Sequence, residues 1–468
     1  MLFDLIDSGI DDAKKIRDTF SQRHPETSLP NTIQYLSKLI LQSLVECKTE
    51  KDTFFKQLHG IMELKVLQER SLHDQAAAKL KSIRRLAVAG QHQWIEYFTY
   101  RNELDSITSG KFHGIDDNEL VSLQMKAKDL LRSLHHIQDH HTLFELLKYR
   151  LVHSGSIASD SERKKMNDLM LSEMALITGK SKDSFASLKL HLLFQGFFFT
   201  NTGDYQTALK TFHLLNQLFE RNITLLEFPP MDYLSALNGI ADSLYTLDKT
   251  QEIPFYLEKA GKLDNPGYPE YFRLQVRKII SVYELAVLIR QEKFLSAITY
   301  IESLDRQMME MYNMVSEEKQ WELYFYCSVA YMKMKSLKKA HHYILRIMQS
   351  ERAQPHLPVC RAVRLLNIII YFEQGEAEYV GYEIRSYKRF IAKQSSRFQS
   401  EKLLLRFIGA WPDKKNSRLS VGEMKKTEND LSKIHTDKYE RHLLKYFDFN
   451  GWVVKKIQNA GLRRTAGR

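Results

Sequence analysis

The sequence predicts an all-α protein built as a solenoid of antiparallel helix pairs. Apolar residues recur at helical spacing along almost the whole chain, whereas the alternation typical of strands is rare. Chain breakers are scarce, with 19 Gly and 10 Pro in 468 residues. An apolar content of 43% suffices for a large core and excludes a disordered chain. We therefore expect stacked helices joined by short turns.

The N-terminal region, residues 1–160, is expected to be helical and continuous with the solenoid. Its pattern predicts one amphipathic helix from Leu2 to about Phe20 and a second helix capped by Asn31. The second helix is expected to bury one apolar face made of Ile33, Leu36, Leu39, Ile40 and Leu44. Longer helices of mixed polarity follow.

Two polar tracts, residues 107–117 and 155–161, predict breaks between helices. Composition leaves open whether they are domain boundaries or loops of one continuous solenoid, and we favour the solenoid. The following region, residues 161–400, contains the clearest helix pair.

That pair spans Ser187 to Glu220 and predicts two helices folded back on each other. Gly196 offers a surface without a side chain where the second helix passes, and Gly203 permits the reversal of the chain. Asp204 is expected to cap the second helix. Four residues at spacings of three and four then form one apolar stripe: Tyr205, Ala208, Phe212 and Leu215.

The order and spacing of these residues resemble a tetratricopeptide repeat, through Gly196, Phe199, Gly203, Tyr205, Ala208 and Phe212. The positions equivalent to Ala208 in later copies are Ile253, Ala297, Ala340 and Val380, at steps of 45, 44, 43 and 40 residues. The standard repeat has about 34 residues. With the opening LFDLIDS, the region resembles uncharacterised bacterial helical-repeat proteins, a resemblance that implies a right-handed superhelix and no activity.

The resemblance also implies a concave groove, lined by the first helix of each pair, that holds a peptide or a helix. Carried onto this chain, the groove candidates are Phe197, Asn201, Asn238, Asp242, Tyr245, Arg290, Phe325 and Lys333. Aromatic residues mixed with a few polar residues suit a partly apolar segment. Phe197 and Leu193 stand where some members carry Lys and Asn, so we expect no carboxylate clamp. The alternative, that several candidates only pack between longer helices, stays open.

The last region, residues 401–468, is strongly basic. It contains 16 Lys and Arg against 8 Asp and Glu, and so carries +8 of the chain's formal +11. Within it, residues 413–426 predict a basic link. An apolar stretch follows that we expect to cap the last helix pair while its cations face water: Lys455, Lys456, Arg463 and Arg464. The alternative is contact with a nucleic acid through this charge.

No catalytic or metal-binding motif rises above chance, and we expect no cofactor. His136 and His140 would share one helix face, as two metal ligands do, but no further ligand lies nearby in sequence. Cys47, Cys327 and Cys360 match no metal or redox spacing and are expected to be buried or half-buried thiols. The start of the chain has no secretion signal and no run of residues is apolar enough to cross a membrane, which predicts a cytoplasmic protein.

The sequence thus predicts a cytoplasmic, non-enzymatic scaffold that binds a protein or peptide in its groove. The alternative function is that of a nucleic-acid-associated regulator acting through residues 401–468. The identity of the partner cannot be derived from the residues.

Overall fold

The computed structural model describes residues 2–7, 12–154, 157–178, 184–304, 309, 317–349, 357–392, 398–410, 434 and 437–465. Every regular element in these ranges is a helix, which confirms the all-α class. The chain divides into two compact units, residues 1–135 and 136–468. The boundary falls inside the long helix α7 (Asp117–Ser154), before the limit that we expected at residue 160. No helix in the described ranges combines the length and the apolar character needed to cross a bilayer.

The first unit contains six helices and the start of α7. In chain order the six are α1 (Leu2–Asp7), α2 (Ala13–Arg23), α3 (Leu29–Lys51), α4 (Thr53–Glu69), α5 (His73–Ala89) and α6 (Gln93–Ser109). The expectation of one helix from Leu2 to Phe20 was wrong, since the side chain of Asp12 caps a separate helix α2. Helices α4, α5 and α6 pack in sequence around a core that includes Leu64, Ile83 and Ile95.

Helix α3 does not bury the face that we expected. Its apolar side chains Ile33, Leu39, Ile40 and Leu44 are between 40% and 57% exposed, and only Leu36 packs against the small cluster of α1 and α2. The helix also begins at Leu29 after Ser28, with Pro30 in its first turn, rather than at a cap on Asn31. Cys47 on the same helix is exposed, which contradicts the expected burial. The pattern assumed a neighbour along the whole helix, but α1 and α2 cover only its first half.

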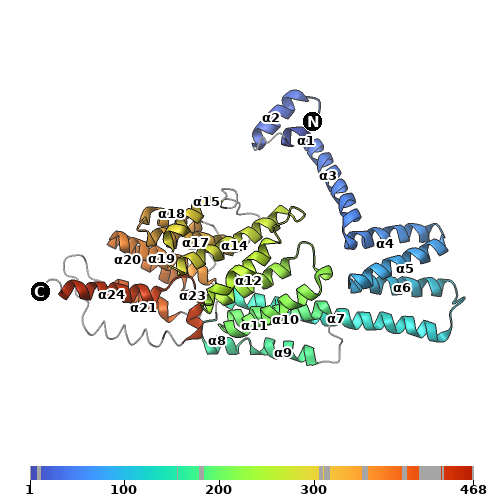
Figure 1. Cartoon of the computed structure of the whole chain (residues 1–468). Coiled ribbons are helices and arrows are strands. Elements are labelled where there is room, and N and C mark those ends of the chain that lie inside the picture. Colours follow the sequence, from blue (N-terminus) through green and yellow to red (C-terminus); the bar gives the residue numbers. More distant parts are fainter. Residues whose placement is uncertain are drawn as a thin grey trace. The chain divides into compact units, whose positions relative to one another are not determined.

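The second unit is a series of helix pairs (Figure 1). After α8 (Asp160–Lys164) and α9 (Asn167–Thr178), each described helix from α10 to α19 packs against the next described helix along the chain. The pairs are α10 (Phe185–Asn201) with α11 (Tyr205–Arg221), α12 (Met231–Thr246) with α13 (Ile253–Gly261), α14 (Glu270–Arg290) with α15 (Phe294–Ser303), α17 (Glu317–Lys333) with α18 (Leu337–Met348), and α19 (Pro358–Gln374) with α20 (Ala377–Phe390). Single turns η1 (Ile223–Leu225) and η2 (Thr250–Glu252) join three of these helices, and α21 (Gln399–Ala410) follows the last pair.

The core of this unit runs through the inner faces of all five pairs. The five positions of the expected repeat frame lie on the second helices and are buried: Ala208, Ile253, Ala297, Ala340 and Val380. Helix α17 is buried on every side from residue 320 to residue 332, as a central helix must be. The repeated pattern of the sequence therefore marks the residues that hold neighbouring helices together.

Two close approaches fix helix α11 between α10 and α12. A Cβ atom on Gly196 or Gly239 would lie 2.6 or 2.5 Å from the ring of Phe212, so this ring fills the space left by a glycine on either side. Gly203 has a φ angle of +77°, in the left-handed region that favours glycine, and leads into the Asp204 cap of α11. The Asp204 side chain accepts a hydrogen bond from the backbone of Thr207, which confirms the expected cap.

The confined ring of Phe212 generates a stability prediction. Gly239→Ala should lower the free energy of unfolding by about 1–3 kcal/mol, because the new methyl group overlaps the ring and forces it to move. Gly409→Ala is the matched control, since nothing lies within 4 Å of its Cβ position in helix α21. The control should be neutral or stabilising by up to about 1 kcal/mol. Urea unfolding followed by circular dichroism measures both; equal effects would contradict the confinement.

Candidate functional site

The chain's own C-terminal residues pack against the first helices of several pairs in the second unit. We call residues 437–458 the tail segment. It begins with η3 (Lys438–Glu440) and α23 (Arg441–Leu444) and continues into α24 (Phe449–Thr465), drawn in red in Figure 1. Leu443, Phe449 and Val453 are fully buried in the common core of the helix pairs. The tail segment therefore packs as part of the unit and contacts several pairs.

Its central contact is an ion pair with helix α12. Lys445 Nζ lies 2.8 and 3.0 Å from the two carboxylate oxygens of Asp242, and the side chains are only 11% and 16% exposed. Burial by itself raises the pKa of Asp242, but the ammonium groups of Lys445 and Lys319 outweigh it and hold that pKa below the ordinary value. Burial in turn lowers the pKa of Lys445, but the Asp242 carboxylate raises it above its usual range. Both groups are therefore charged when folded.

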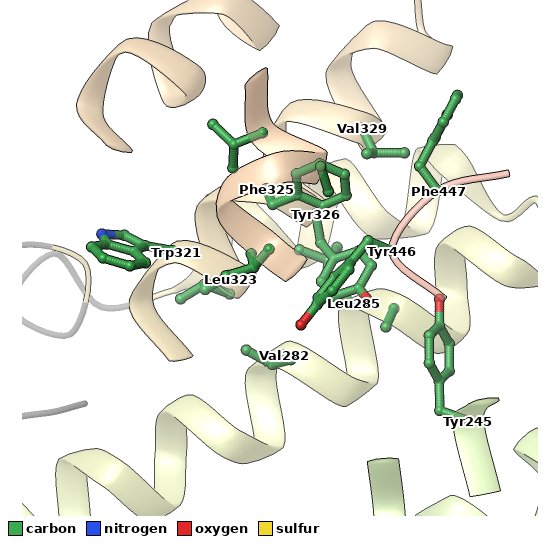
Figure 2. Close-up of a cluster of buried hydrophobic side chains, with 14 of the residues drawn as sticks. Tyr245, Val282, Leu285, Trp321, Leu323, Phe325, Tyr326, Val329, Tyr446 and Phe447 are labelled. Carbon is green, nitrogen blue, oxygen red and sulfur yellow. The ribbon is translucent and has the colours of Figure 1, made fainter. Parts of the chain in front are cut away.

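Tyr446 enters the core beside this pair. Its hydroxyl donates a hydrogen bond of 3.0 Å to Glu322 of helix α17, whose other oxygen accepts one of 2.5 Å from Lys319. The ring of Tyr446 lies 5.9 Å from that of Phe325 and 6.5 Å from that of Tyr326, in the cluster that Figure 2 shows. A buried hydroxyl that reaches a carboxylate satisfies both groups, so Tyr446 fits this position in shape and in polarity.

Two cations of the helix pairs contact the tail segment, one at the backbone of Lys445 and one at the ring of Phe447. Arg290 donates to the carbonyl oxygen of Lys445 at 3.5 Å, and its guanidinium group also pairs with Asp248 and lies over the ring of Tyr245. Lys333 lies 5.2 Å from the ring centre of Phe447, as in a cation–π contact. These contacts fix residues 445–447 against three helices.

A second anchor lies on helix α19. Trp452 donates its indole N–H to Glu373 at 2.9 Å, and Lys456 donates to the other oxygen of the same carboxylate at 2.7 Å. The Trp452 ring packs against Phe372 and Phe407, with ring centres 5.4 and 6.2 Å away. One carboxylate thus binds two donors of the tail segment that are one helical turn apart.

The start of the tail segment is fixed by three other contacts. Tyr439 donates to Asp160 at 2.7 Å, and the carboxylate of Glu440 accepts from the backbone N–H groups of Gln399 and Ser400 at the start of α21. The Nδ1 atom of His442 and the hydroxyl of Tyr205 share a hydrogen bond of 2.9 Å. Burial and the nearby ammonium of Lys445 lower the pKa of His442 to about 3, so its ring is neutral at pH 7.

Most of the predicted groove residues meet the tail segment. Asp242, Tyr245, Arg290, Phe325 and Lys333 form or support the contacts with residues 445–447.

The other three predicted residues lie further from this centre. Asn238 accepts a hydrogen bond from Tyr283, and Phe197 packs beside the small cluster that contains Tyr439. The Asn201 side chain donates to the carbonyl of Phe197 on its own helix. We expected an open groove at these residues, whereas the tail segment covers their central part.

Sequence reasoning missed Glu322 and Glu373, and it gave Lys445 no partner. One signal was present, because each of these charges stands in a strongly apolar stretch of a helix or turn. A charge in such surroundings needs a partner, because burying an unpaired ion costs on the order of several kcal/mol. Spacing could not show which acid meets which cation.

The tail segment also differs from the cap that we expected over the last pair alone. Its aromatic side does reach the last pair through Trp452, but residues 438–447 extend to α8, α11, α12 and α17. Lys455 is exposed as expected, whereas Lys456 is paired with Glu373 rather than facing water. The side chains of Arg463 and Arg464 and the basic link at residues 413–426 lie outside the described residues.

A second polar cluster joins helices α7, α9 and α10. His140 and His191 both direct Nδ1 at Oε1 of Glu173, at 2.6 and 3.1 Å, and the ring of His136 lies 4.7 Å from that of His140. Burial raises the pKa of Glu173, but the two hydrogen bonds outweigh it and lower that pKa. Among the residues that the structure describes, no group of three or more His, Cys, Asp or Glu side chains is arranged to hold a metal ion. The geometry is that of a polar link between three helices.

No family model matches the sequence, and no curated protein sequence matches it.

The buried ion pair generates the second prediction. Lys445→Met should lower the free energy of unfolding by about 3–5 kcal/mol, because the Asp242 carboxylate is then buried without a counter-charge. Adding Asp242→Asn to Lys445→Met should restore most of that loss. Lys262→Met removes an exposed ion pair with Glu258, each side chain 71% exposed, and should cost less than about 1 kcal/mol. Chemical unfolding of wild type and these three variants measures the differences, and a double variant as unstable as Lys445→Met would argue against a buried pair.

The lowered pKa of His442 predicts how the free energy of unfolding changes at acidic pH. Between the ordinary value of 6.5 and the folded value of about 3, the unfolded chain takes up a proton that the folded chain does not. The contribution of the neutral ring is therefore complete above pH 6.5 and is lost progressively as the pH falls towards about 3, by about 1.4 kcal/mol per pH unit.

His442→Gln keeps a hydrogen-bond acceptor and removes this titration. Between about pH 7.5 and about pH 5, wild type should lose about 2 kcal/mol more stability than His442→Gln. Urea unfolding at the two pH values measures this difference. The other histidines with a lowered pKa, His92, His213 and His341, are present in both chains and cancel. Parallel losses would mean that His442 is protonated in the folded chain.

Proposed function

We propose that this chain is a protein-binding scaffold that holds a segment of a partner polypeptide on the inner face of its helix pairs. In this proposal the pairs from α10 to α20 stack as a right-handed superhelix of the tetratricopeptide type. The burial of Ala208 and its four equivalents on successive second helices supports the stacking. The first helices then present one continuous surface to the partner.

One observation supports peptide binding above all. This surface already holds a peptide segment, through carboxylates on three first helices: Asp242 on α12, Glu322 on α17 and Glu373 on α19. A surface that orders a short segment through side-chain contacts from several helices has the properties of a peptide-recognition site. The aromatic residues between these carboxylates supply the apolar contact area.

A peptide display screen tests this function. The full-length chain with Lys445→Ala and Tyr446→Ala in the tail segment is the bait, because these changes remove two donors of the resident segment and leave every residue of the helix pairs unchanged. Displayed random peptides of about 15 residues should be enriched for a basic residue followed by aromatic residues, since such residues complement the carboxylates and aromatic side chains.

The matched control bait carries the same two changes together with Asp242→Lys and Glu322→Lys. It should lose the enrichment, because the anchors for a basic segment are then reversed in charge. Circular dichroism establishes that both baits are folded. Enrichment of the same peptides by both baits, or of none by either, would contradict a peptide-binding function for this surface.

A further inference from the structure

Most of the hydrogen bonds described above run in one direction, from a donor on the tail segment to an acceptor on the helical scaffold. Tyr439, Lys445, Tyr446, Trp452 and Lys456 each donate a hydrogen bond to a carboxylate of the helical scaffold. The acceptors are Asp160, Asp242, Glu322 and Glu373. Opposite cases occur at Glu440, which accepts from α21, and at the carbonyl of Lys445. At these contacts the scaffold thus supplies carboxylate acceptors and the tail segment supplies basic and aromatic donors, while Arg290 and Lys333 of the scaffold contact the tail segment as cations.

From this complementarity we propose that the tail segment is a displaceable internal ligand, and that the partner is a protein segment with the same chemistry. That segment has a basic residue followed directly by two aromatic residues, as in Lys445–Tyr446–Phe447, and a second aromatic donor such as Trp452 further along. The proposal rests on the proposed function, because the partner occupies the surface assigned there. It adds that the tail segment blocks this surface until a competing segment replaces it.

The buried charges determine which competitors succeed. Displacing the tail segment by an apolar peptide leaves Asp242 and Glu373 without the donors of Lys445, Trp452 and Lys456, and leaves Glu322 with Lys319 alone. This loss disfavours such a peptide. A peptide that supplies an ammonium group and a phenol at the same places restores both contacts. The surface therefore selects for basic aromatic segments by rejecting all others.

Covalent attachment favours the resident segment over any free competitor. A tethered ligand acts at an effective concentration on the order of 1 mM, so a partner must bind tightly or the internal contact must first weaken. The ion pair of Lys445 with Asp242 is the contact whose loss weakens the tail segment most, because both groups are buried and charged. A change confined to Lys445 leaves the whole scaffold surface intact for a competitor.

The test measures binding of a labelled peptide to the full-length protein. The probe is a synthetic peptide with the sequence of residues 437–458 and a fluorescent label, and the readout is fluorescence anisotropy. The Lys445→Glu chain should bind the probe about tenfold or more tightly than wild type, because a second carboxylate beside Asp242 expels the internal copy. Lys455→Glu is the matched control, since Lys455 is exposed on the same segment, and it should bind the probe as wild type does.

A charge-swapped chain makes the test specific. Asp242→Lys combined with Lys445→Glu restores the internal pair with reversed charges and also removes the carboxylate that the lysine of the probe needs, so binding of the probe should fall to the wild-type level or below it. A scrambled probe of the same composition should bind to no chain. The proposal is overturned if a folded Lys445→Glu chain binds the probe no better than wild type, or if the scrambled probe binds equally well.

Further outcomes distinguish displacement of the tail segment from binding of a partner. If Lys445→Glu does not fold, Tyr446→Phe is the substitute, because it removes only the hydroxyl contact with Glu322. Hydrogen exchange of α23 and α24 should then rise, while that of α12 stays unchanged. Unchanged exchange in α23 and α24 overturns the proposal. If the probe binds Lys445→Glu but display enriches no foreign peptide, the displaceable tail is supported and the partner-binding function fails. If foreign peptides bind wild type and Lys445→Glu alike, the function is supported and displacement is overturned.

Discussion

The second unit depends on pairing the carboxylates of Asp242 and Glu322, which lie inside its helical core. Asp242 and Glu322 lie on first helices whose surroundings are otherwise apolar and aromatic. Such carboxylates destabilise a core unless donors reach them, and the tail segment supplies the donors as Lys445 and Tyr446. The helix pairs and the tail segment are therefore complementary: the pairs provide the carboxylates and the apolar surface, and the tail segment provides donors and covers that surface.

This dependence changes the meaning of the expected groove. An open surface of Tyr245, Phe325 and the aromatic residues around them would be a large exposed apolar patch of the kind that marks a binding site. The tail segment covers it with residues of matching shape and opposite polarity. Coverage by the chain's own residues keeps the surface specific, because only a segment that satisfies the same carboxylates can take its place.

The sequence pattern predicted the buried positions of the helix pairs in the second unit but not those of helix α3 in the first unit, and this difference has a physical reason. Hairpins with short turns, such as α10 with α11, are specified locally, since a glycine at the crossing point and an apolar stripe suffice to bring two consecutive helices together. The frame built on Gly196 and Ala208 therefore located the buried positions of all five pairs. Helix α3 shows the limit of the same reasoning, because its apolar residues have helical spacing but no neighbour among the described residues covers most of them. The spacing of apolar residues shows which face of a helix is apolar, but it does not show which element packs against that face.

The sequence by itself determined the helical class, the positions of small residues where helices cross, and the basic aromatic character of the C-terminal region. Only the tertiary structure decided that this region lies along the inner face of the pairs and that Lys445 meets Asp242, 203 residues earlier in the chain. Local spacing governs which side chains share a helix face, because a helix repeats every few residues. The pairing of distant charges depends instead on how all the helices stack, and no short stretch of residues contains that information.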